Sequence, residues 1–200
     1  MKVLGVGGHA KVIIDAAELS DLKVSGVYDD DPKTHETMFC GLQVEGAITA
    51  DLSGPAVIAI GNNEIRKNID QRVLGCQWKT VIHPNAIIAD DVEIGEGTVI
   101  MAGAVIQPGC KIGRHVIINT GACLDHDCEI ADYVHIAPNC SLAGGVKLDE
   151  GTFAGIGSSI VQYVSIGKWS TLGAGSVVIH DIPPHCTAVG VPAKPIKFHR

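Results

Sequence analysis

Residues 98–130 read TVIMAGAVIQPGCKIGRHVIINTGACLDHDCEI, and in this stretch a large aliphatic residue returns at every sixth position. The same register runs from residue 82 to residue 178 as seventeen hexads without an insertion or deletion. Sixteen of the seventeen first positions are Ile, Leu or Val, Ala154 being the exception, and every fifth position is Ala, Val, Thr, Cys, Ser or Ile. An amphipathic helix cannot keep this period, because about 3.6 residues per turn would rotate the apolar stripe away.

A period of six suits a triangular coil of three short strands, in which one large and one small side chain of each hexad point inward. The corners of such a coil accept Gly, Asn and Asp, and the chain holds 24 glycines. Three hexads make one turn, so the repeat gives nearly six coils, and strands about 4.8 Å apart predict a prism roughly 27 Å long. The tail from Pro183 onward leaves the repeat, and its prolines predict a loop.

Residues before the repeat follow a different pattern, which alternates between predicted strands and helices. Strands are expected at 2–6, 24–28, 56–60 and 78–82, with helices at 10–19 and from Asn62 or Asn63 to Leu74. This alternation predicts an α/β Rossmann-like βαβ module with a small parallel sheet. The sequence therefore divides into a βαβ domain over 1–81 and a coil domain with its tail over 82–200.

Composition and charge exclude several classes of protein. A formal net charge of −7 without a run of Lys and Arg argues against a nucleic-acid-binding surface. The start of the chain enters a strand directly, and no segment approaches the length of a membrane span, so neither a signal peptide nor a membrane helix is expected. Seven cysteines without a CxxC pair fit a reducing compartment, and the chain is expected to be cytoplasmic.

Several of these motifs together resemble a known family. The hexad columns, NTGACLDHDCEI at 119–130 and GVPAKPIK at 190–197 resemble the hexapeptide acyltransferases. With GVGGHAK at 5–11 and YDDD at 28–31, they resemble the bacterial nucleotide-sugar N-acetyltransferases of the bacillosamine and perosamine type, with sialic acid O-acetyltransferases nearby. The resemblance covers essentially the whole chain. It implies a left-handed β-helix and a homotrimer with active sites between adjacent prisms, where acetyl-CoA lies along the β-helix.

The turn at 5–9 opens a predicted helix, whose free N–H groups and dipole favour a diphosphate. A tight turn without a ligand is the alternative reading. The turn lacks the third glycine of a dinucleotide fingerprint, and about 80 residues hold only half of a dehydrogenase fold. The resemblance favours a sugar nucleotide, for which the expected lining residues are Gly7, Gly8, His9, Asp29, Asp30 and Gly61.

His126 is the candidate catalytic base. It lies between Asp125 and Asp127 at a predicted corner, where side chains face outward. Flanking carboxylates hold an imidazole in one tautomer and raise its basicity, as proton removal from an amine or hydroxyl requires. An ordinary surface histidine is the alternative reading. The resemblance places the base at His126 and implies that Asp127 tunes it.

The resemblance also marks residues that would otherwise read as ordinary corner positions. It implies that Asn119 lies near the acceptor sugar and His135 near the acetyl-CoA thioester. The pair Gly144-Gly145 permits close approach of a ligand, so the Gly144 N–H is a candidate oxyanion donor. Further positions implied to contact the cofactor are Ile156 and Ala174 along the pantetheine arm and Lys194 at a CoA phosphate.

The positions of the cysteines and histidines in the sequence argue against a cysteine nucleophile and against a zinc site. Cys110, Cys128 and Cys140 occupy the inward fifth column, which predicts core residues rather than an acyl-enzyme nucleophile. A zinc site of the β-helical carbonic anhydrase kind needs three histidines, and His180 and His185 lie beyond the coils with no third partner. No metal is expected.

The resulting hypothesis is direct acetyl transfer from acetyl-CoA to the amine of a UDP- or GDP-linked 4-amino sugar, with His126 as general base. An O-acetyltransferase acting on sialic acid or another sugar is the alternative within the class. A non-catalytic hexapeptide scaffold is the alternative outside it. The residues do not distinguish UDP from GDP, nor one ring position from another.

Overall fold

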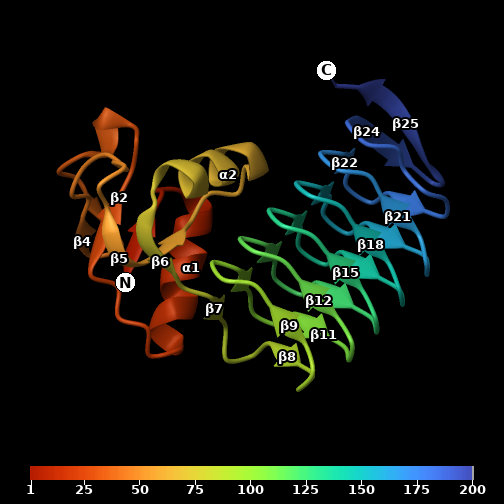
Figure 1. The fold of residues 1–200 in the computed structure, drawn as a ribbon, viewed down its shortest axis with the longest axis horizontal. Coiled ribbons are helices and arrows are strands. Elements are labelled where there is room, and N and C mark those ends of the chain that lie inside the picture. Colours follow the sequence, from red (N-terminus) through yellow and green to blue (C-terminus); the bar gives the residue numbers. More distant parts are fainter. Residues whose placement is uncertain (200) are drawn as a thin grey trace.

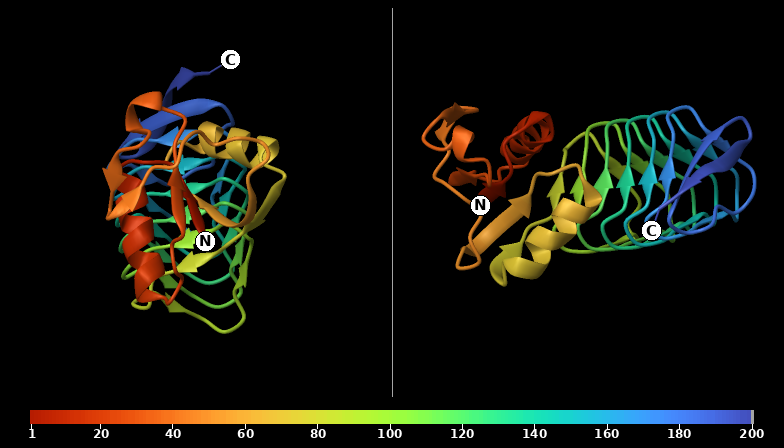
Figure 2. Two further views of the ribbon diagram at one scale, coloured as in Figure 1. Left: turned by 90° about the vertical axis from the view of Figure 1, so that its left-hand side faces the viewer. Right: turned by 90° about the horizontal axis from the view of Figure 1, so that it is seen from above.

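The computed structural model describes residues 1–199 and shows an α/β module followed by a parallel β-helix (Figure 1). The coil is left-handed, as the resemblance implied. The module lies beside the first coils of the prism, and a C-terminal hairpin lies at the opposite end (Figure 2). None of the helices within these residues is both long and apolar enough to cross a membrane.

The N-terminal module is a four-stranded parallel sheet of order β2-β1-β5-β6. Its elements are β1 (Lys2–Leu4), α1 (Gly8–Leu19), β2 (Gly26–Tyr28), β5 (Ser53–Ile58), α2 (Asn63–Arg72) and β6 (Gly75–Trp78). Between β2 and β5 lie the 3-10 helix η1 (Pro32–Thr34) and the antiparallel pair β3 (Met38–Phe39) and β4 (Leu42–Gln43), which sequence analysis did not predict. Asn62 caps α2, since its side chain accepts from the Ile65 N–H at 2.9 Å.

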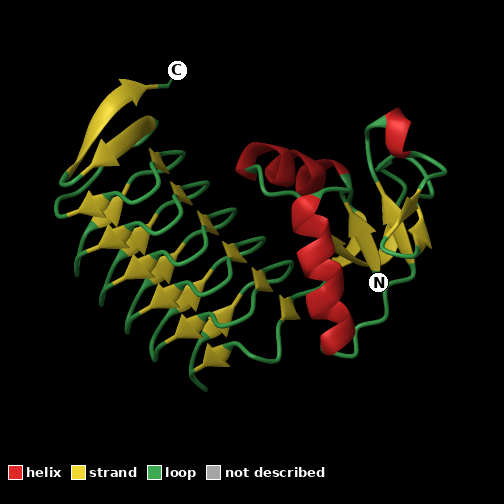
Figure 3. Cartoon of the chain, turned by 180° about the vertical axis from the view of Figure 1, so that it is seen from behind, coloured by secondary structure: helices red, strands yellow, loops and turns green. Residues whose placement is uncertain are grey.

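Two-residue strands form the prism, and they stack into three parallel sheets, here called faces 1, 2 and 3 (Figure 3). Face 1 contains β7 (Val81–Ile82), β10 (Val99–Ile100), β13 (Ile117–Ile118), β16 (His135–Ile136), β19 (Phe153–Ala154) and β22 (Thr171–Leu172). Face 2 contains β8 (Ile87–Ile88), β11 (Val105–Ile106), β14 (Cys123–Leu124), β17 (Ser141–Leu142), β20 (Ser159–Ile160) and β23 (Val177–Val178). Face 3 contains β9 (Glu93–Ile94), β12 (Lys111–Ile112), β15 (Glu129–Ile130), β18 (Lys147–Leu148) and β21 (Ser165–Ile166).

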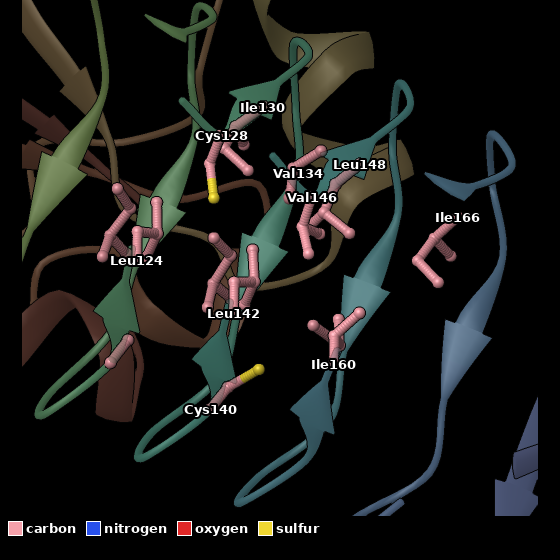
Figure 4. Packing of buried hydrophobic residues seen from close by; sticks show 14 of the residues in the cluster. Leu124, Cys128, Ile130, Val134, Cys140, Leu142, Val146, Leu148, Ile160 and Ile166 are labelled. Carbon is pink, nitrogen blue, oxygen red and sulfur yellow. The ribbon is translucent and has the colours of Figure 1, made fainter. Parts of the chain in front are cut away.

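The second residue of each strand points inward and forms the predicted aliphatic column. Leu124, Leu142 and Ile160 follow one another along face 2, and all three are buried (Figure 4). Cys128 and Cys140 lie in the same core, as their place in the fifth column predicts. Burial of these columns is the main source of stability for a coil that has so few residues in each strand.

The hairpin at the C-terminus differs from the predicted loop. Strands β24 (Cys186–Gly190) and β25 (Ala193–Phe198) pair antiparallel, and β24 continues face 1 beyond β22. The two prolines at 183–184 do end the hexad repeat, but the chain then returns to the end of the sheet, where β22 offers an unpaired edge.

Face 1 is covered over its first three coils by the N-terminal module. The outward side chains of β7, β10 and β13 are Val81, Val99 and Ile117, and each is at most 1% exposed. They pack with α1 residues such as Ile13 and Ala17. From the sequence alone, apolar residues that point outward from the prism, such as Val99 and Ile117, would be assigned to a contact between subunits. The structure instead covers these two residues with the N-terminal module of the same chain.

Buried polar groups join α2 to the corner between faces 3 and 1. Arg66 is 1% exposed, and it donates from Nε to the His115 carbonyl at 2.7 Å and from Nη2 to the Tyr133 carbonyl at 2.6 Å. Asn63 donates to the Gly151 carbonyl at 2.9 Å. These three carbonyls belong to successive coils, so α2 is fixed along the axis of the prism as well as against it.

Asp70 adds a second set of contacts at the same corner. Its carboxylate lies 3.0 Å from His115 Nε2 and 2.5 Å from the Tyr133 hydroxyl, with Arg114 at 3.4 Å. Burial alone would raise the pKa of Asp70, but the adjacent His115 imidazole and the hydrogen bond from the Tyr133 hydroxyl outweigh it and lower the pKa to about 2. The carboxylate therefore stays charged wherever the protein is folded at ordinary pH.

We expect the inward column to dominate stability, and β18 offers a matched pair of substitutions. Leu148 is 1% exposed and Lys147 beside it points outward. Leu148→Ala should lower the free energy of unfolding by about 2–5 kcal/mol, because it removes buried methyl groups and leaves a cavity. Lys147→Ala removes only a surface pair with Glu129 and should cost no more than about 1 kcal/mol. Urea unfolding at one fixed protein concentration tests this, and equal losses would contradict it.

Candidate active site

His126 lies at the corner between faces 2 and 3, where β14 ends and β15 has not yet begun. Its ring is 53% exposed, and Nδ1 lies 2.8 Å from Asp127 Oδ2. The backbone N–H of His126 donates to Asp125 Oδ1 at 2.8 Å. Asp127 adopts φ 59°, a left-handed conformation that Asp tolerates better than most residues and that turns its carboxylate back toward the imidazole.

The Asp127 carboxylate determines which ring nitrogen carries the proton in neutral His126. Asp127 can only accept, so neutral His126 carries its proton on Nδ1 and presents the lone pair of Nε2. The hydrogen bond to Asp127 raises the pKa of His126 above its ordinary value, and the charges of Asp125 and Asp127 act in the same direction. His126 has therefore the tautomer and the basicity of a general base.

Gly144 lies directly beneath this imidazole, one coil further along. A methyl group on Gly144 would lie 2.6 Å from both Cε1 and Nε2 of His126, so only glycine leaves room for the ring. The Gly145 N–H donates to the His126 carbonyl at 2.9 Å and holds the two corners together. Within residues 1–199 the Gly144 N–H donates to no protein acceptor, which leaves it available to an oxygen close to His126.

A second group of predicted residues gathers on face 1. His135 points outward from β16, and its Nδ1 lies 3.1 Å from the Gly61 carbonyl, while Nε2 lies 3.2 Å from Asn119 Nδ2. The ring of His9 lies against it, with a centroid distance of 6.1 Å, and Phe153 meets it edge-on at 5.0 Å. The structure thus brings His9, Gly61, Asn119 and His135 together.

Both histidines of this group are neutral at physiological pH. Burial and the nearby Arg66 cation lower the pKa of His135 to about 3 and that of His9 to about 4. His9 Nε2 is buried without a hydrogen-bond partner within residues 1–199, so it is a polar atom that a ligand in this region can satisfy.

The predicted diphosphate turn has the expected position and one unexpected brace. Gly7 is the N-cap of α1 and Gly8 its first residue, and the space where their Cβ atoms would stand is open. Asp29 accepts from the Val6 N–H at 2.7 Å and from the Asp31 N–H at 2.8 Å. One oxygen of Asp29 therefore holds the turn in shape, and the other holds the loop that follows β2.

The neighbouring carboxylate has its own partners within the module. Asp30 pairs with Arg72 at the end of α2 and accepts from the Ile48 N–H at 3.1 Å. Its side chain is still 49% exposed. Neither contact of Asp30 could be predicted from a local motif, since the partners lie 18 and 42 residues away along the chain.

A cleft of about 760 Å³ runs along face 1 beside α2, and Gly61 joins it to the His135 group. Its lining consists of Gly61, Asn62, Asn63, Glu64, Lys67, Asn68, Gly151, Phe153, Trp169, Thr171, His185 and His199. Sequence analysis missed most of these residues. Lys67 lies on α2 and Trp169 on the coil, and Lys67 Nζ lies 5.1 Å from the centroid of the Trp169 ring because α2 docks on the coil. No local sequence motif could have linked these two residues.

The predicted cofactor positions Ile156 and Ala174 lie at the corner between faces 1 and 2, where both are exposed. They are stacked, since the Gly175 N–H donates to the Ile156 carbonyl at 2.8 Å. Lys194 is exposed on β25. None of these three residues contacts His126 within residues 1–199, because they lie at another corner or beyond the last coil.

One chain does not bring the two groups of site residues together. His135 and its neighbours lie on face 1, and the corner between faces 2 and 3 that carries His126 is the vertex opposite that face. The body of the prism separates them. His180 and His185 lie beyond β23, the last strand of the hexad repeat, and no three His, Cys, Asp or Glu side chains of the described chain are placed to hold a metal ion.

Two family models match the chain. Residues 1–73 match the PglD N-terminal domain, and the segments 79–108, 92–126 and 109–144 match the bacterial transferase hexapeptide family of six repeats. Among curated proteins, the UDP-N-acetylbacillosamine N-acetyltransferase of Bacillus subtilis is 44% identical over 105 residues, and serine acetyltransferase of Escherichia coli is 46% identical over 48 residues. The alignments cover 49% of the former protein and 18% of the latter.

Solved structures match over nearly the whole chain. The perosamine N-acetyltransferase of Caulobacter crescentus, in complex with CoA and GDP-perosamine, is 36% identical with a TM-score of 0.93, and the match covers 98% of this chain and 96% of that one. The acetyltransferase domain of PglB from Neisseria gonorrhoeae, in complex with acetyl coenzyme A, is 34% identical with a TM-score of 0.88 and 98% coverage of both chains. The expected fold is confirmed by these matches.

The closeness of Gly144 to His126 gives a testable prediction. Gly144→Ala should fold normally, because its backbone is not in the left-handed region, but the added methyl must displace the imidazole. If His126 is the base, kcat should fall about 10- to 100-fold, as expected for a misplaced catalytic group. Gln162→Ala, at the same corner one coil further, is the control. Full activity in Gly144→Ala would show that the position of the His126 ring above Gly144 is irrelevant to turnover.

Proposed function

This chain belongs to the family of nucleotide-sugar N-acetyltransferases that includes perosamine N-acetyltransferase, and we propose that it transfers an acetyl group from acetyl-CoA to the amine of a nucleotide-linked 4-amino-deoxysugar. The observation that carries the proposal is the His126–Asp127 pair above the free N–H of Gly144. A base beside an oxyanion donor is what direct acyl transfer requires. No covalent bond between the acetyl group and the enzyme is needed.

The reaction follows from this geometry. His126 Nε2 takes a proton from the amine as its nitrogen attacks the thioester carbonyl, and a C–N bond forms. The carbonyl oxygen becomes negative and accepts from the Gly144 N–H. Collapse of the tetrahedral intermediate breaks the C–S bond, and the proton held by His126 neutralises the leaving CoA thiolate. Asp127 stabilises the imidazolium between the two steps and does not itself exchange a proton.

The N-terminal module supplies the acceptor site in this proposal. The open turn at Gly7 and Gly8 presents the N-terminus of α1 to the diphosphate, and the His9 ring lies between that turn and His135. Asn119 and His135 lie where the sugar would reach the prism, and the cleft beside Gly61 gives it room. Asp30, half exposed at the end of β2, is the candidate for contact with the nucleoside.

Acetyl-CoA is proposed to lie along the prism. Ile156 and Ala174 form an exposed, stacked pair at the corner between faces 1 and 2, which suits the pantetheine arm, and Lys194 lies on β25 of the C-terminal hairpin. His135 would be near the thioester end. All seven cysteines are unpaired, which fits a reducing cytoplasm.

Assembly is part of the proposal, because one chain holds His126 and His135 on opposite sides of its prism. A site that uses both needs His126 of one subunit and the face 1 group of its neighbour. Face 2 offers a surface for such a contact, since its outward residues include Ile87, Val105 and Val177, whereas face 3 carries alternating Glu and Lys. We therefore propose a homotrimer with its sites between subunits.

A direct test is a turnover screen with acetyl-CoA and both UDP- and GDP-linked 4-amino sugars, in which the released thiol is measured. Acetylation of an amino sugar confirms the proposal, and the two nucleotides decide between UDP and GDP. The O-acetyltransferase alternative predicts turnover only with an acceptor that has a hydroxyl and no amine. A scaffold predicts no thiol release with any acceptor and no effect of substitutions at His126.

The role of His126 predicts a set of kinetic results. His126→Ala should fold normally, since an exposed corner residue supports no core column, and should lower kcat about 10²- to 10⁴-fold. Asp127→Asn should move the acidic limb of kcat/KM to lower pH, because loss of the negative charge lowers the pKa of the imidazole. The double variant should resemble His126→Ala alone, since Asp127 then has nothing to tune. Near-normal turnover in His126→Ala would rule out the general-base role.

The shared site predicts complementation between two defective chains. Trimers of His126→Ala and trimers of His135→Ala should both be impaired, but co-expression should restore activity in mixed trimers. About a quarter of the sites should then pair an intact His126 with an intact His135. Co-expression of His126→Ala with the chain that carries both substitutions is the control, because it yields no intact site. Mixed trimers as inactive as their parents would contradict a site between subunits.

A further inference from the structure

Arg66 is a buried cation without a buried anion. It is 1% exposed, and within residues 1–199 it forms no ion pair with a carboxylate. Its guanidinium is bound by carbonyl oxygens of Ile60, Gly61, His115 and Tyr133, at 3.1, 3.3, 2.7 and 2.6 Å, and by Asn63 Oδ1 at 3.0 Å. Burial lowers the pKa of Arg66 to about 9, so the group is still charged at neutral pH.

Burial of the Arg66 cation costs free energy, because the hydration that it loses is replaced only by hydrogen bonds to neutral acceptors. Docking of α2 alone does not require it, because Asn63 and Asp70 make the same connection with other groups. What Arg66 does, and those residues do not, is hold the carbonyl of Gly61. That carbonyl is also the acceptor of His135.

The Gly61 carbonyl fixes the tautomer of His135. A carbonyl oxygen can only accept, so His135 must carry its proton on Nδ1, which lies 3.1 Å away. Nε2 is then unprotonated and accepts from Asn119 Nδ2 at 3.2 Å. The hydrogen bonds therefore run in one direction, from Asn119 through His135 to Gly61, whose carbonyl also accepts from Arg66.

We propose that Arg66 is a positioning residue for acetyl transfer: by holding the Gly61 carbonyl it keeps His135 neutral in its Nδ1–H tautomer, which orients Asn119 at the acceptor site. The link to turnover rests on the proposed function. The link to His135 rests on the hydrogen bonds alone.

Burial and the nearby Arg66 charge also favour the neutral form of His135. Burial is the largest cause of the low pKa of His135, and the charged or titratable groups that act on it are Arg66 from α2 and His9 from α1. The hydrogen bond to Gly61 alone would favour imidazolium, which could donate from both nitrogens. The Arg66 cation opposes that form, so the neutral ring remains and Nε2 keeps its lone pair for Asn119.

A purely mechanical role is the rival explanation, and the same interface supplies the control. The Tyr133 hydroxyl donates to Asp70 across the junction of α2 and the coil. Tyr133→Phe removes that contact but keeps the backbone carbonyl that Arg66 binds, and it leaves the Gly61–His135–Asn119 series untouched. If loss of Arg66 merely loosens the junction, Tyr133→Phe and the Arg66 variants should change the tautomer of His135 alike. If Arg66 positions His135, only the Arg66 variants should change it.

The test compares wild type, Arg66→Met, Arg66→Lys and Tyr133→Phe by long-range ¹H–¹⁵N NMR of His135 between pH 5 and 8, together with kcat and KM. Wild type and Tyr133→Phe should show one Nδ1–H tautomer that does not titrate. Arg66→Met should show a mixture of tautomers and a raised pKa, with kcat about 10- to 100-fold lower. Arg66→Lys keeps the charge but cannot span the carbonyls, so it should restore the low pKa while leaving mixed tautomers.

Folded Arg66 variants with the wild-type His135 spectrum would overturn the proposal, as would equal changes in Tyr133→Phe. If Arg66→Met does not fold, Arg66→Lys decides by the same spectrum. The NMR measurement needs no acetyl transfer. Failure of every amino-sugar acceptor with the NMR result intact would refute the proposed function while leaving the control of His135 by Arg66 established.

Discussion

The stacking of residues eighteen positions apart is the constraint on which the rest of the structure depends. Because one coil contains three hexads, Val99 pairs with Ile117 and His135 with Phe153, and within the hexad repeat each strand residue pairs with the residue eighteen positions further on. Gly144 lies under His126 for this reason alone. A single inserted residue between them would leave both motifs intact in the sequence and would break the alignment of the His126 ring with Gly144, on which the proposed roles of both residues depend.

The same spacing explains how the N-terminal module is attached. Neighbouring coils lie about 4.8 Å apart, so the corner carbonyls form a regular row along the prism. A guanidinium has donors in one rigid plane that point outward from its different edges, and Arg66 uses Nε for His115 and Nη2 for Tyr133 on the next coil. The coils thus provide a row of carbonyl acceptors, and a single Arg side chain can donate to two successive members of this row. A module docked in this way is held in one axial register relative to the site residues on face 1.

Sequence predicted the parts of the molecule that depend on a repeated pattern. The aliphatic columns, the corner position of His126 and the inward cysteines all follow from the period of six. Contacts between the two domains have no such pattern: Val99 and Ile117 look like any outward residue of the prism until α1 covers them, and Arg66 looks like an exposed helix residue. Likewise, Asp29 reads as a ligand residue after a strand, although its carboxylate braces the turn at Val6.

His126 and His135 show why burial and hydrogen-bond partners, rather than residue type, decide a role. His126 is exposed beside a carboxylate, which raises its pKa and prepares it to take a proton; His135 is buried beside Arg66, which lowers its pKa and keeps it neutral. Both rings carry their proton on Nδ1 and present Nε2, one because of Asp127 and the other because of Gly61. A site that joins them across two subunits would combine one ring that changes charge during the reaction with one that does not. The amine would lose its proton to His126 alone, since the low basicity of His135 prevents it from competing for that proton.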